Sequence, residues 1–325
     1  MELKVTNMCD VEGFVKTPLN YTGNKSRLLS QILPVFPKKI NRFVDLCCGG
    51  ASVGLNVIGN SQEVICLDIN KSVIELLQTL QMFSEKSIVS KVESIIAEFG
   101  LSDTFNKGYD IYKSYVEGNN GFKNYNKAGY EKLRNYFNSA VMDSNVRSIY
   151  LLVLLSYCFN NDIRFNSAGK FNMPIGKTDF NASIRDKLHS FKVGTKNKNI
   201  KFYFSDFSVV KEFELSKNDF VYCDPPYLIT NAVYNMANSQ NNNSWNDFQE
   251  RKLLDTLTFL HQNGVKFALS NVLSKEGLEN TILIDWIEKH KFNVLDIDYH
   301  YRSSSYHKKN RQSHEREVLI LNYGI

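Results

Sequence analysis

The sequence predicts an α/β fold in which an open sheet binds a ligand at one edge and a mostly helical lobe is inserted into the chain. Three observations support this prediction. At 42–57 an apolar run leads into a loop of small residues and then a helical stretch, as in nucleotide-binding α/β units. At 220–223 a second apolar run ends at an acidic turn. Between them, the segment 101–147 is rich in Asn, Gly, Lys and Tyr and interrupts the alternation of strands and helices.

The composition is that of a soluble globular protein, with 43% hydrophobic and 22% charged residues among 325. This length allows one large domain or two modest ones. The net charge is +5, but positions 101–200 alone carry about +7 by direct count. A basic lobe on a near-neutral body suits a polyanionic partner, although a solvated, Lys-rich surface gives the same count.

The six cysteines are scattered through mostly apolar runs, and none has the spacing of a zinc site. We therefore expect reduced, buried thiols in a cytoplasmic protein, and no metal. The most hydrophobic run, 149–155, is far too short to cross a bilayer, so no membrane partner is expected. A monomer is expected.

The first elements of the chain place two acids at strand ends. A Gly-Asn turn precedes Lys25, and Ser26 is expected to cap a helix that closes at Pro34. Strands are expected at 42–46 and 63–67, which places Asp45 and Asp68 at the ends of neighbouring strands.

The loop between these two strands, 47–52, contains Gly49 and Gly50. Asp68 follows the loop by about 20 residues, the position of an acid that accepts hydrogen bonds from ribose hydroxyls. Ala51 stands where a dinucleotide fingerprint would have a further glycine. A ligand with an adenosine but no pyrophosphate is therefore favoured.

The middle and the end of the chain continue the α/β pattern around the lobe. A hairpin at 160–177 interleaves polar, aromatic and basic residues about a Ser-Ala-Gly turn, which suits a binding surface and also an ordinary exposed hairpin. The other expected elements are helices at 71–99, 148–159 and 247–261, strands at 200–204, 220–223, 266–269, 292–299 and 317–322, and a basic loop containing Arg302, His307, Lys308, Lys309, Arg311 and Arg316.

The turn Asp224-Pro225-Pro226-Tyr227 is the strongest functional signal in the sequence. Ligands of open α/β sheets bind beyond the carboxyl ends of strands, where this turn is expected to lie. An ionised Asp and the stiffly held carbonyl of Pro225 are both hydrogen-bond acceptors, so together they suit a planar amino group with two N–H bonds. The ring of Tyr227 offers a face on which a planar base can stack.

These motifs, in this order, resemble the Dam-type DNA adenine-N6 methyltransferases of the alpha group, almost from end to end. The family has an N-terminal Gly-Lys motif, a glycine loop, a target-recognition insert and the acidic Pro-Pro-Tyr turn. The hairpin also resembles the family's recognition hairpin, through Arg164-Phe165-Asn166 and Phe171-Asn172-x-Pro174-x-Gly176. Two departures from the family pattern are Asp45-Leu46-Cys47 in the first motif and Ala51 in place of its second glycine.

The resemblance implies a Rossmann-like S-adenosylmethionine-dependent sheet formed by 1–75 and 195–325, with a target-recognition domain at 76–194. It implies S-adenosylmethionine as cofactor, with Lys25 suited to the methionine carboxylate and Tyr21 able to pack on the cofactor. The expected cofactor-binding residues are Tyr21, Lys25, Asp45, Gly49, Asp68, Asp206, Phe207 and Asp224. The expected catalytic residues are Asp224, Pro225, Pro226 and Tyr227, which receive an adenine that has left the DNA stack.

The resemblance also implies double-stranded DNA as partner, with GATC as the expected site and a cognate restriction endonuclease as a possible companion. The expected DNA-binding residues are Phe159, Asn160, Arg164, Asn166, Pro174 and Lys177. Three alternatives remain open from the sequence: a cytosine-N4 DNA methyltransferase, a catalytically inactive DNA-binding protein of the same fold, and a dinucleotide-dependent oxidoreductase, which the missing glycine disfavours.

Overall fold

The computed structural model describes residues 13–116, 118–229, 245–297 and 315–324. Its centre is a sheet with the strand order β3-β2-β1-β4-β5-β8-β7, and the short β6 pairs with β5. Strands β3, β2, β1, β4 and β5 are parallel, whereas β8 is antiparallel to both β5 and β7. The predicted α/β fold is confirmed. The strands are β1 (Ile40–Asp45), β2 (Ser61–Asp68), β3 (Ile200–Phe204), β4 (Phe220–Cys223), β5 (Lys266–Lys275), β6 (Leu278–Glu279), β7 (Asn293–Asp296) and β8 (Glu315–Leu321).

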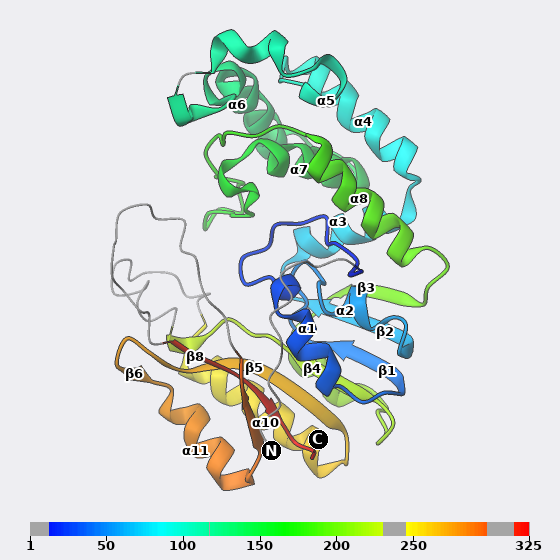
Figure 1. Ribbon diagram of the computed structural model, residues 1–325, viewed down its shortest axis with the longest axis vertical. Coiled ribbons are helices and arrows are strands. Elements are labelled where there is room, and N and C mark those ends of the chain that lie inside the picture. The colour runs from blue at the N-terminus through cyan, green and yellow to red at the C-terminus, as the bar shows by residue number, and fades with distance from the viewer. Residues whose placement is uncertain (1–12, 117, 230–244, 298–314, 325) are drawn as a thin grey trace.

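Helices cover the sheet and form a lobe above it (Figure 1). The short α1 (Leu29–Ile32) and α2 (Gly54–Val57) belong to the larger core cluster, in which Phe36 packs against Phe43 and Phe220. A second cluster lies between the sheet and helices α10 (Asp247–Gln262) and α11 (Thr281–His290). The sheet is therefore buried on both faces, which is why the central β4 is an uninterrupted apolar run.

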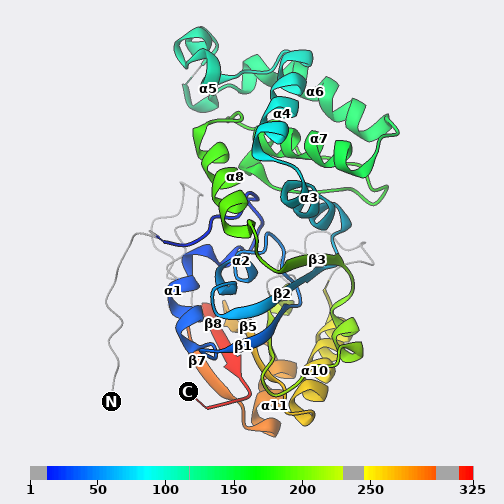
Figure 2. The same ribbon diagram turned by 90° about the vertical axis from the view of Figure 1, so that its right-hand side faces the viewer.

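The lobe is built from α4 (Glu85–Glu98), α5 (Thr104–Lys107), α6 (Lys123–Ser139) and α7 (Ser144–Tyr157), with α8 (Ala182–Thr195) leading back to β3. Helix α3 (Lys71–Met82) contacts both β3 and α7, so it joins the lobe to the sheet (Figure 2). The chain enters the lobe after β2 and leaves it before β3, as expected of an insert. The division into domains at 76 and 194 stays a prediction.

The topology places one crevice at the carboxyl edge of the sheet. After β1 the chain moves outward to β2 and β3, and it then returns to β4 on the other side of β1. Ligands of open α/β sheets bind where the strand order reverses in this way. Asp45 ends β1, Asp68 ends β2, and Asp224 directly follows β4, so the three acids lie at this one edge.

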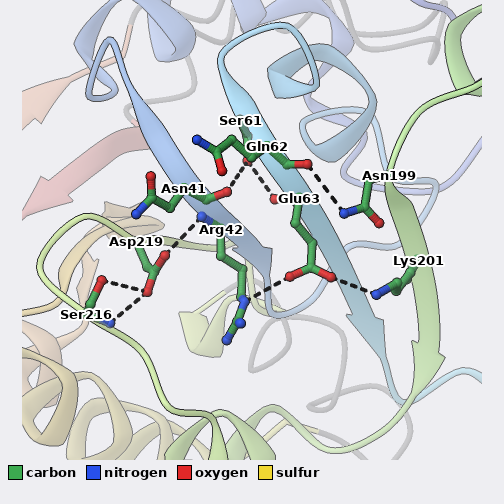
Figure 3. Close-up of polar contacts among 9 residues, drawn as sticks. All are labelled: Asn41, Arg42, Ser61, Gln62, Glu63, Asn199, Lys201, Ser216 and Asp219. Carbon is green, nitrogen blue, oxygen red and sulfur yellow. Dashed lines mark hydrogen bonds and ion pairs between the residues drawn. The ribbon is translucent and has the colours of Figure 1, made fainter.

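The opposite, amino edge is joined by a polar network (Figure 3). Glu63 of β2 accepts from Arg42 of β1 at 3.0 Å and from Lys201 of β3 at 2.7 Å. These two contacts hold the pKa of Glu63 below its usual range, with partial burial opposing them. Asp219, just before β4, accepts from the backbone amide of Arg42 at 2.9 Å. The first four parallel strands are thus linked on the side away from the crevice.

Three expectations about local structure were wrong. The helix expected over 71–99 is two helices, because Ser84 accepts a hydrogen bond from the Ser87 amide and starts α4. Asn24, not Ser26, caps the turn at Lys25, since its side chain accepts from the Ser26 amide.

The third difference is the length of β5, which continues past 269. Its polar residues Ser270 and Asn271 are fully buried because each has a buried partner. The hydroxyls of Ser270 and Tyr222 are 2.8 Å apart, and Asn271 donates to Glu250 at 3.2 Å. A polar residue with a hydrogen-bond partner can occupy the sheet interior, which an apolar-run criterion overlooks.

The hairpin is present but has few ladder contacts of its own, with bridges at Cys158–Ile175 and Phe165–Phe171. Helix α6 supports it from behind. The Tyr130 hydroxyl and the Arg134 guanidinium donate to the Met173 carbonyl at 2.8 and 3.0 Å. Asn138 donates to the Phe171 carbonyl and accepts from its amide. These residues, one helical turn apart, form what we call the α6 brace.

Candidate active site

The turn that follows β4 contains Asp224, and one oxygen of its carboxylate contacts two other side chains. Asp224 has a side chain that is 17% exposed, and its Oδ1 lies 2.8 Å from the Lys25 ammonium. The Tyr227 hydroxyl is 2.9 Å from the same oxygen. Pro225 is buried and Pro226 is exposed.

Lys25 reaches Asp224 because of the turn that precedes it. Gly23 has φ +82°, a backbone conformation that glycine adopts without strain. Asn24 then starts the short 3-10 helix η1 (Lys25–Arg27). The Lys25 side chain is 5% exposed, and its ammonium also donates to the Gly23 carbonyl at 3.2 Å.

A second carboxylate completes this cluster, and sequence reasoning missed it. Glu317 of β8 is 11% exposed and lies 3.6 Å from the Lys25 ammonium. Its Oε1 is 3.1 Å from the Tyr227 hydroxyl. Because β8 is antiparallel to β5, its beginning lies at the edge where the parallel strands end. An acid at the start of an apolar run at 317–322 was the available signal.

The glycine loop is held by Asp68 rather than by glycines alone. The Asp68 carboxylate accepts from the Gly49 amide at 2.8 Å and from the Asn70 amide at 2.7 Å. Gly49 has φ +49°, and a Cβ there would stand 2.7 Å from Cδ1 of Tyr21. Ala51 has φ +60°, so it keeps the left-handed backbone that the family's glycine would adopt freely.

An open pocket lies between the Gly23 turn, the glycine loop and Asp224, with an empty volume of about 360 Å³ that includes adjoining solvent. Its lining includes Tyr21, Lys25, Asp45, Gly49 and Asp224, five of the residues expected to bind a cofactor. Asp68 adjoins this pocket through its bond to the Gly49 amide.

Burial raises the pKa of every carboxylate around this pocket. The pKa of Asp45 lies well above its usual range because the group is buried, and Asp224 reinforces the effect. Burial also raises the pKa values of Asp68, Asp224 and Glu317, while Lys25 opposes the effect at the last two. Oδ1 of Asp45 is buried without a hydrogen-bond partner in the described part of the chain.

The remaining two expected cofactor residues follow β3. Asp206 accepts from Lys252 at 2.8 Å and starts the 3-10 helix η6 (Phe207–Glu212). Burial opposes these contacts, but hydrogen bonds from Lys252 and Ser208 lower the pKa of Asp206 overall. Phe207 is buried, and the Lys252 ammonium lies 5.1 Å from the centre of the Phe207 ring. Nearby in sequence, Ile69 follows Asp68 and is 71% exposed, an apolar side chain that the sequence reading did not single out.

The hairpin exposes several of the residues expected to touch DNA. Phe159 is 47% exposed, and Asn160 has φ +56°. Arg164 is exposed, but its Nε donates to the Asn172 side chain at 2.9 Å and its Nη2 to the Asn172 carbonyl at 3.2 Å.

The other three hairpin residues are also exposed. The Asn166 side chain holds the hairpin turn by accepting from the backbone amides of Ala168 and Lys170. The Pro174 carbonyl accepts from the Phe159 amide, and the Lys177 carbonyl accepts from the Phe122 amide.

Some expectations fall on residues outside the described ranges. Arg302, His307, Lys308, Lys309 and Arg311 of the basic loop lie there, as does most of the Asn-rich stretch 238–246. Arg316, at the end of that loop, is described and forms an ion pair with Asp296 at 2.7 Å.

The described residues include no helix that is both long and apolar enough to cross a membrane. No group of three or more His, Cys, Asp or Glu among them could hold a metal ion.

Comparison with known proteins gives a consistent result. The model of the D12 class N6 adenine-specific DNA methyltransferases matches residues 21–303. The type II methyltransferase M.FokI of Planomicrobium okeanokoites is 39% identical over 312 residues, which are 95% of this chain and 43% of the relative. The modification methylase StsI of Streptococcus sanguinis is 36% identical over 315 residues, with the same two coverages. The chain thus spans less than half the length of these two relatives.

A relative of closer length is the type II methyltransferase M.MjaIII of Methanocaldococcus jannaschii. It is 29% identical over 267 residues, which are 79% of this chain and 84% of the relative. The family match begins at Tyr21, ends beyond β7 and takes in every element around the pocket except β8. The resemblance seen in the motifs is therefore confirmed, and the chain belongs to the D12 class of N6 adenine-specific DNA methyltransferases.

Proposed function

We propose that this chain transfers a methyl group to N6 of adenine in duplex DNA, with S-adenosylmethionine as the methyl donor. The observation that carries the proposal is the arrangement of Asp224. Lys25 holds its Oδ1 at 2.8 Å, the Tyr227 hydroxyl lies 2.9 Å from the same oxygen, and its side chain stays 17% exposed at the pocket. A carboxylate fixed in this way at the topological switch point is ready to accept a hydrogen bond from a substrate.

Adenine N6 is a poor nucleophile because its lone pair is delocalised into the ring. Asp224 Oδ2 accepts one N–H of this amine and the Pro225 carbonyl accepts the other. These bonds favour a pyramidal nitrogen whose lone pair points along the line of attack. Since the barrier is then met mainly by positioning, the rigidity of the turn matters more than the basicity of Asp224.

The pocket residues fit the proposed methyl donor. The donor carries an ammonium group. Oδ1 of Asp45, which has no hydrogen-bond partner within the described ranges, is an acceptor suited to it. Lys25, which lines the same pocket, stays the candidate for the methionine carboxylate in addition to its ion pair with Asp224. Asp68, Asp206 and Phe207 are proposed to bind the adenosine. When bound, S-adenosylmethionine supplies an electrophilic methyl group on a positively charged sulfur.

The exposed hairpin is proposed to recognise the duplex. Arg164 is proposed to donate to guanine in the major groove, and Phe159 with Asn160 to fill the gap left by the flipped adenine. Unstacking the base costs about a few kcal/mol, of which stacking on Tyr227 offsets about 1–3 kcal/mol. Asn166, Pro174 and Lys177 complete the proposed surface, and GATC stays the predicted site.

We also propose the cellular setting of the reaction. The names of M.FokI and StsI, a type II methyltransferase and a modification methylase, support a cognate restriction endonuclease as companion. The five free cysteines among the described residues support a reducing, cytoplasmic setting. A monomer stays the prediction, and analytical ultracentrifugation tests it.

The proposed function is tested by incubating the purified chain with S-adenosylmethionine and a plasmid, with and without chelator. Digestion to nucleosides is expected to give N6-methyladenine in both samples. Only N4-methylcytosine would establish the cytosine alternative. No methylated base, despite a measured affinity for S-adenosylmethionine, would indicate an inactive DNA-binding protein.

A further inference from the structure

Glu317 stands in the site without belonging to any motif of the sequence, and its position is well determined by the fold. Its backbone is held on both sides, because it is paired with Val272 of β5 and its carbonyl accepts from the Ile297 amide at 3.0 Å. Its side chain is 11% exposed and is directed at Lys25 and Tyr227. Nearly complete burial of a carboxylate costs free energy unless charged or polar partners compensate it.

The geometry gives one hydroxyl two competing acceptors. The Tyr227 hydroxyl is 2.9 Å from Asp224 Oδ1 and 3.1 Å from Glu317 Oε1. A phenol carries a single hydrogen, so it donates fully to only one carboxylate at a time. The choice matters chemically, because a hydrogen bond from Tyr227 draws negative charge away from whichever carboxylate receives it.

The charges around Glu317 show what decides this choice. Lys25 lies closer to Asp224, at 2.8 Å, than to Glu317, at 3.6 Å. Asp224 therefore already has a strong donor, whereas Glu317 depends more on the Tyr227 hydrogen for compensation of its charge. Burial raises the pKa of Glu317, and the charge of Asp224 adds to this effect, whereas Lys25 and the Tyr227 hydrogen bond lower the pKa.

We propose that Glu317 is a positioning residue for methyl transfer, which acts by taking the Tyr227 hydrogen bond away from Asp224. Asp224 then stays a stronger acceptor for the amine of the flipped base, and the Tyr227 ring is held at a fixed angle beside it. This inference rests on the proposed function, since it concerns the same turn and the same amine. It adds a residue of β8 to a site otherwise formed by the Gly23 turn, β1, β2 and β4.

The test is a double-mutant cycle between Glu317 and Tyr227, read as the single-turnover rate of adenine methylation at saturating DNA and S-adenosylmethionine. Glu317→Ala is expected to lower this rate about 10-fold in the wild-type background, because Tyr227 then donates to Asp224. In the Tyr227→Phe background no such hydrogen exists, so adding Glu317→Ala is expected to change the rate by less than about 2-fold. Glu317→Gln, whose amide oxygen still accepts, is expected to keep most of the rate.

A matched control is Glu315→Gln, which removes a neighbouring carboxylate of the same strand that pairs with Lys275 at 2.9 Å. Its rate is expected to be unchanged, and the dissociation constant of S-adenosylmethionine is expected to be unchanged in all Glu317 variants. An equal loss from Glu317→Ala in both backgrounds would overturn the inference, because the effect would then run through Lys25 or the fold. Full activity of Glu317→Ala would overturn it as well. Absence of methylation by the wild type would instead reject the proposed function.

Discussion

The Lys25 ammonium and the Asp224 carboxylate form a 2.8 Å ion pair between the N-terminal glycine turn and the end of β4. Both side chains are largely buried, so neither can lose its partner without leaving a poorly solvated charge. The two most widely separated motifs of the sequence are therefore one structural unit. The first two predictions follow from this pair.

Replacing Asp224 by Asn should remove methyl transfer while leaving the fold intact. The amide keeps the shape of the side chain, but it is uncharged and can present a donor where an acceptor is needed. We expect a fall of at least about 100-fold in the single-turnover rate. The thermal midpoint should be lower, because Lys25 loses its nearest partner, but unfolding should stay cooperative. Asp255→Asn, on the exposed face of α10, is the control and should keep full activity. Near-normal turnover of folded Asp224→Asn would remove Asp224 from the catalytic assignment.

As the pH is lowered, the rate of methylation should begin to fall while the pH is still above about 4, the usual pKa of an aspartate. Burial raises the pKa of Asp224, and only its ionised form accepts through both oxygens. Since Lys25 lowers this pKa, Lys25→Met should move the acid limb of the profile to higher pH. Single-turnover rates from pH 5 to 8, at saturating S-adenosylmethionine, check both statements. An acid limb that is the same in the two proteins would show that Asp224 does not govern it.

Gly49→Ala should weaken binding of S-adenosylmethionine. The added Cβ would stand 2.7 Å from the Tyr21 ring, and φ at this position is +49°. The ring or the loop must therefore shift, and the pocket wall with it. We expect the dissociation constant from calorimetry to rise about 10-fold, equivalent to about 1.4 kcal/mol. Gly59→Ala is a matched control, because its Cβ meets nothing within 4 Å. Equal affinities of the two variants would exclude Tyr21 and Gly49 from the binding site.

Arg164→Ala should relax the choice of DNA sequence at one base pair. Nε and Nη2 of Arg164 each donate one hydrogen bond to Asn172. The remaining N–H groups of the guanidinium can donate to a guanine. Losing a bidentate contact of this kind costs about 1–3 kcal/mol of discrimination. Methylation rates on the preferred site and its single-base variants measure the effect, and Asn172→Ala should reproduce part of it. Lys170→Ala, in the hairpin turn, is the control. A uniform loss on every duplex would make Arg164 a phosphate contact instead.

Glu63→Gln should lower stability without affecting catalysis, because Glu63 lies at the edge of the sheet away from the pocket. Its pKa is lowered in the folded state, so its contribution is present above the unfolded pKa and is lost as the pH falls through the folded value. The partly exposed contacts limit the effect to about 1 kcal/mol at neutral pH. Urea unfolding at pH 7 and pH 3 should show this difference at pH 7 and a smaller one at pH 3. Glu214→Gln, on an exposed loop, should show none at either pH.

The sequence predicted the parts of the fold that depend on local pattern. Strands 200–204 and 220–223 were placed correctly because each is a short apolar run between turn residues. The acids of β1, β2 and β4 were assigned to one edge because parallel strands end together. The break between α3 and α4 was missed, since the apolar residues of 71–99 keep a helical period across Ser84.

What could not be predicted depends on pairing between distant strands. Glu317 joins the site only because β8 runs antiparallel to β5, and nothing near residue 317 indicates that direction. The ion pair of Lys25 with Asp224 was also not predicted. From the sequence, Lys25 was assigned to the cofactor and Asp224 to the substrate amine, and a contact between the two residues was not considered. The bond from Arg164 to Asn172 depends on the register of a hairpin with only two bridges.

The α6 brace has a consequence for which substitutions the hairpin can tolerate. Tyr130, Arg134 and Asn138 hold the hairpin through carbonyl and amide groups of its main chain. All amino acids but proline offer both groups, so the support does not depend on which side chains the hairpin displays. Substitutions at its exposed positions, which are proposed to recognise DNA, should therefore leave these supporting hydrogen bonds in place.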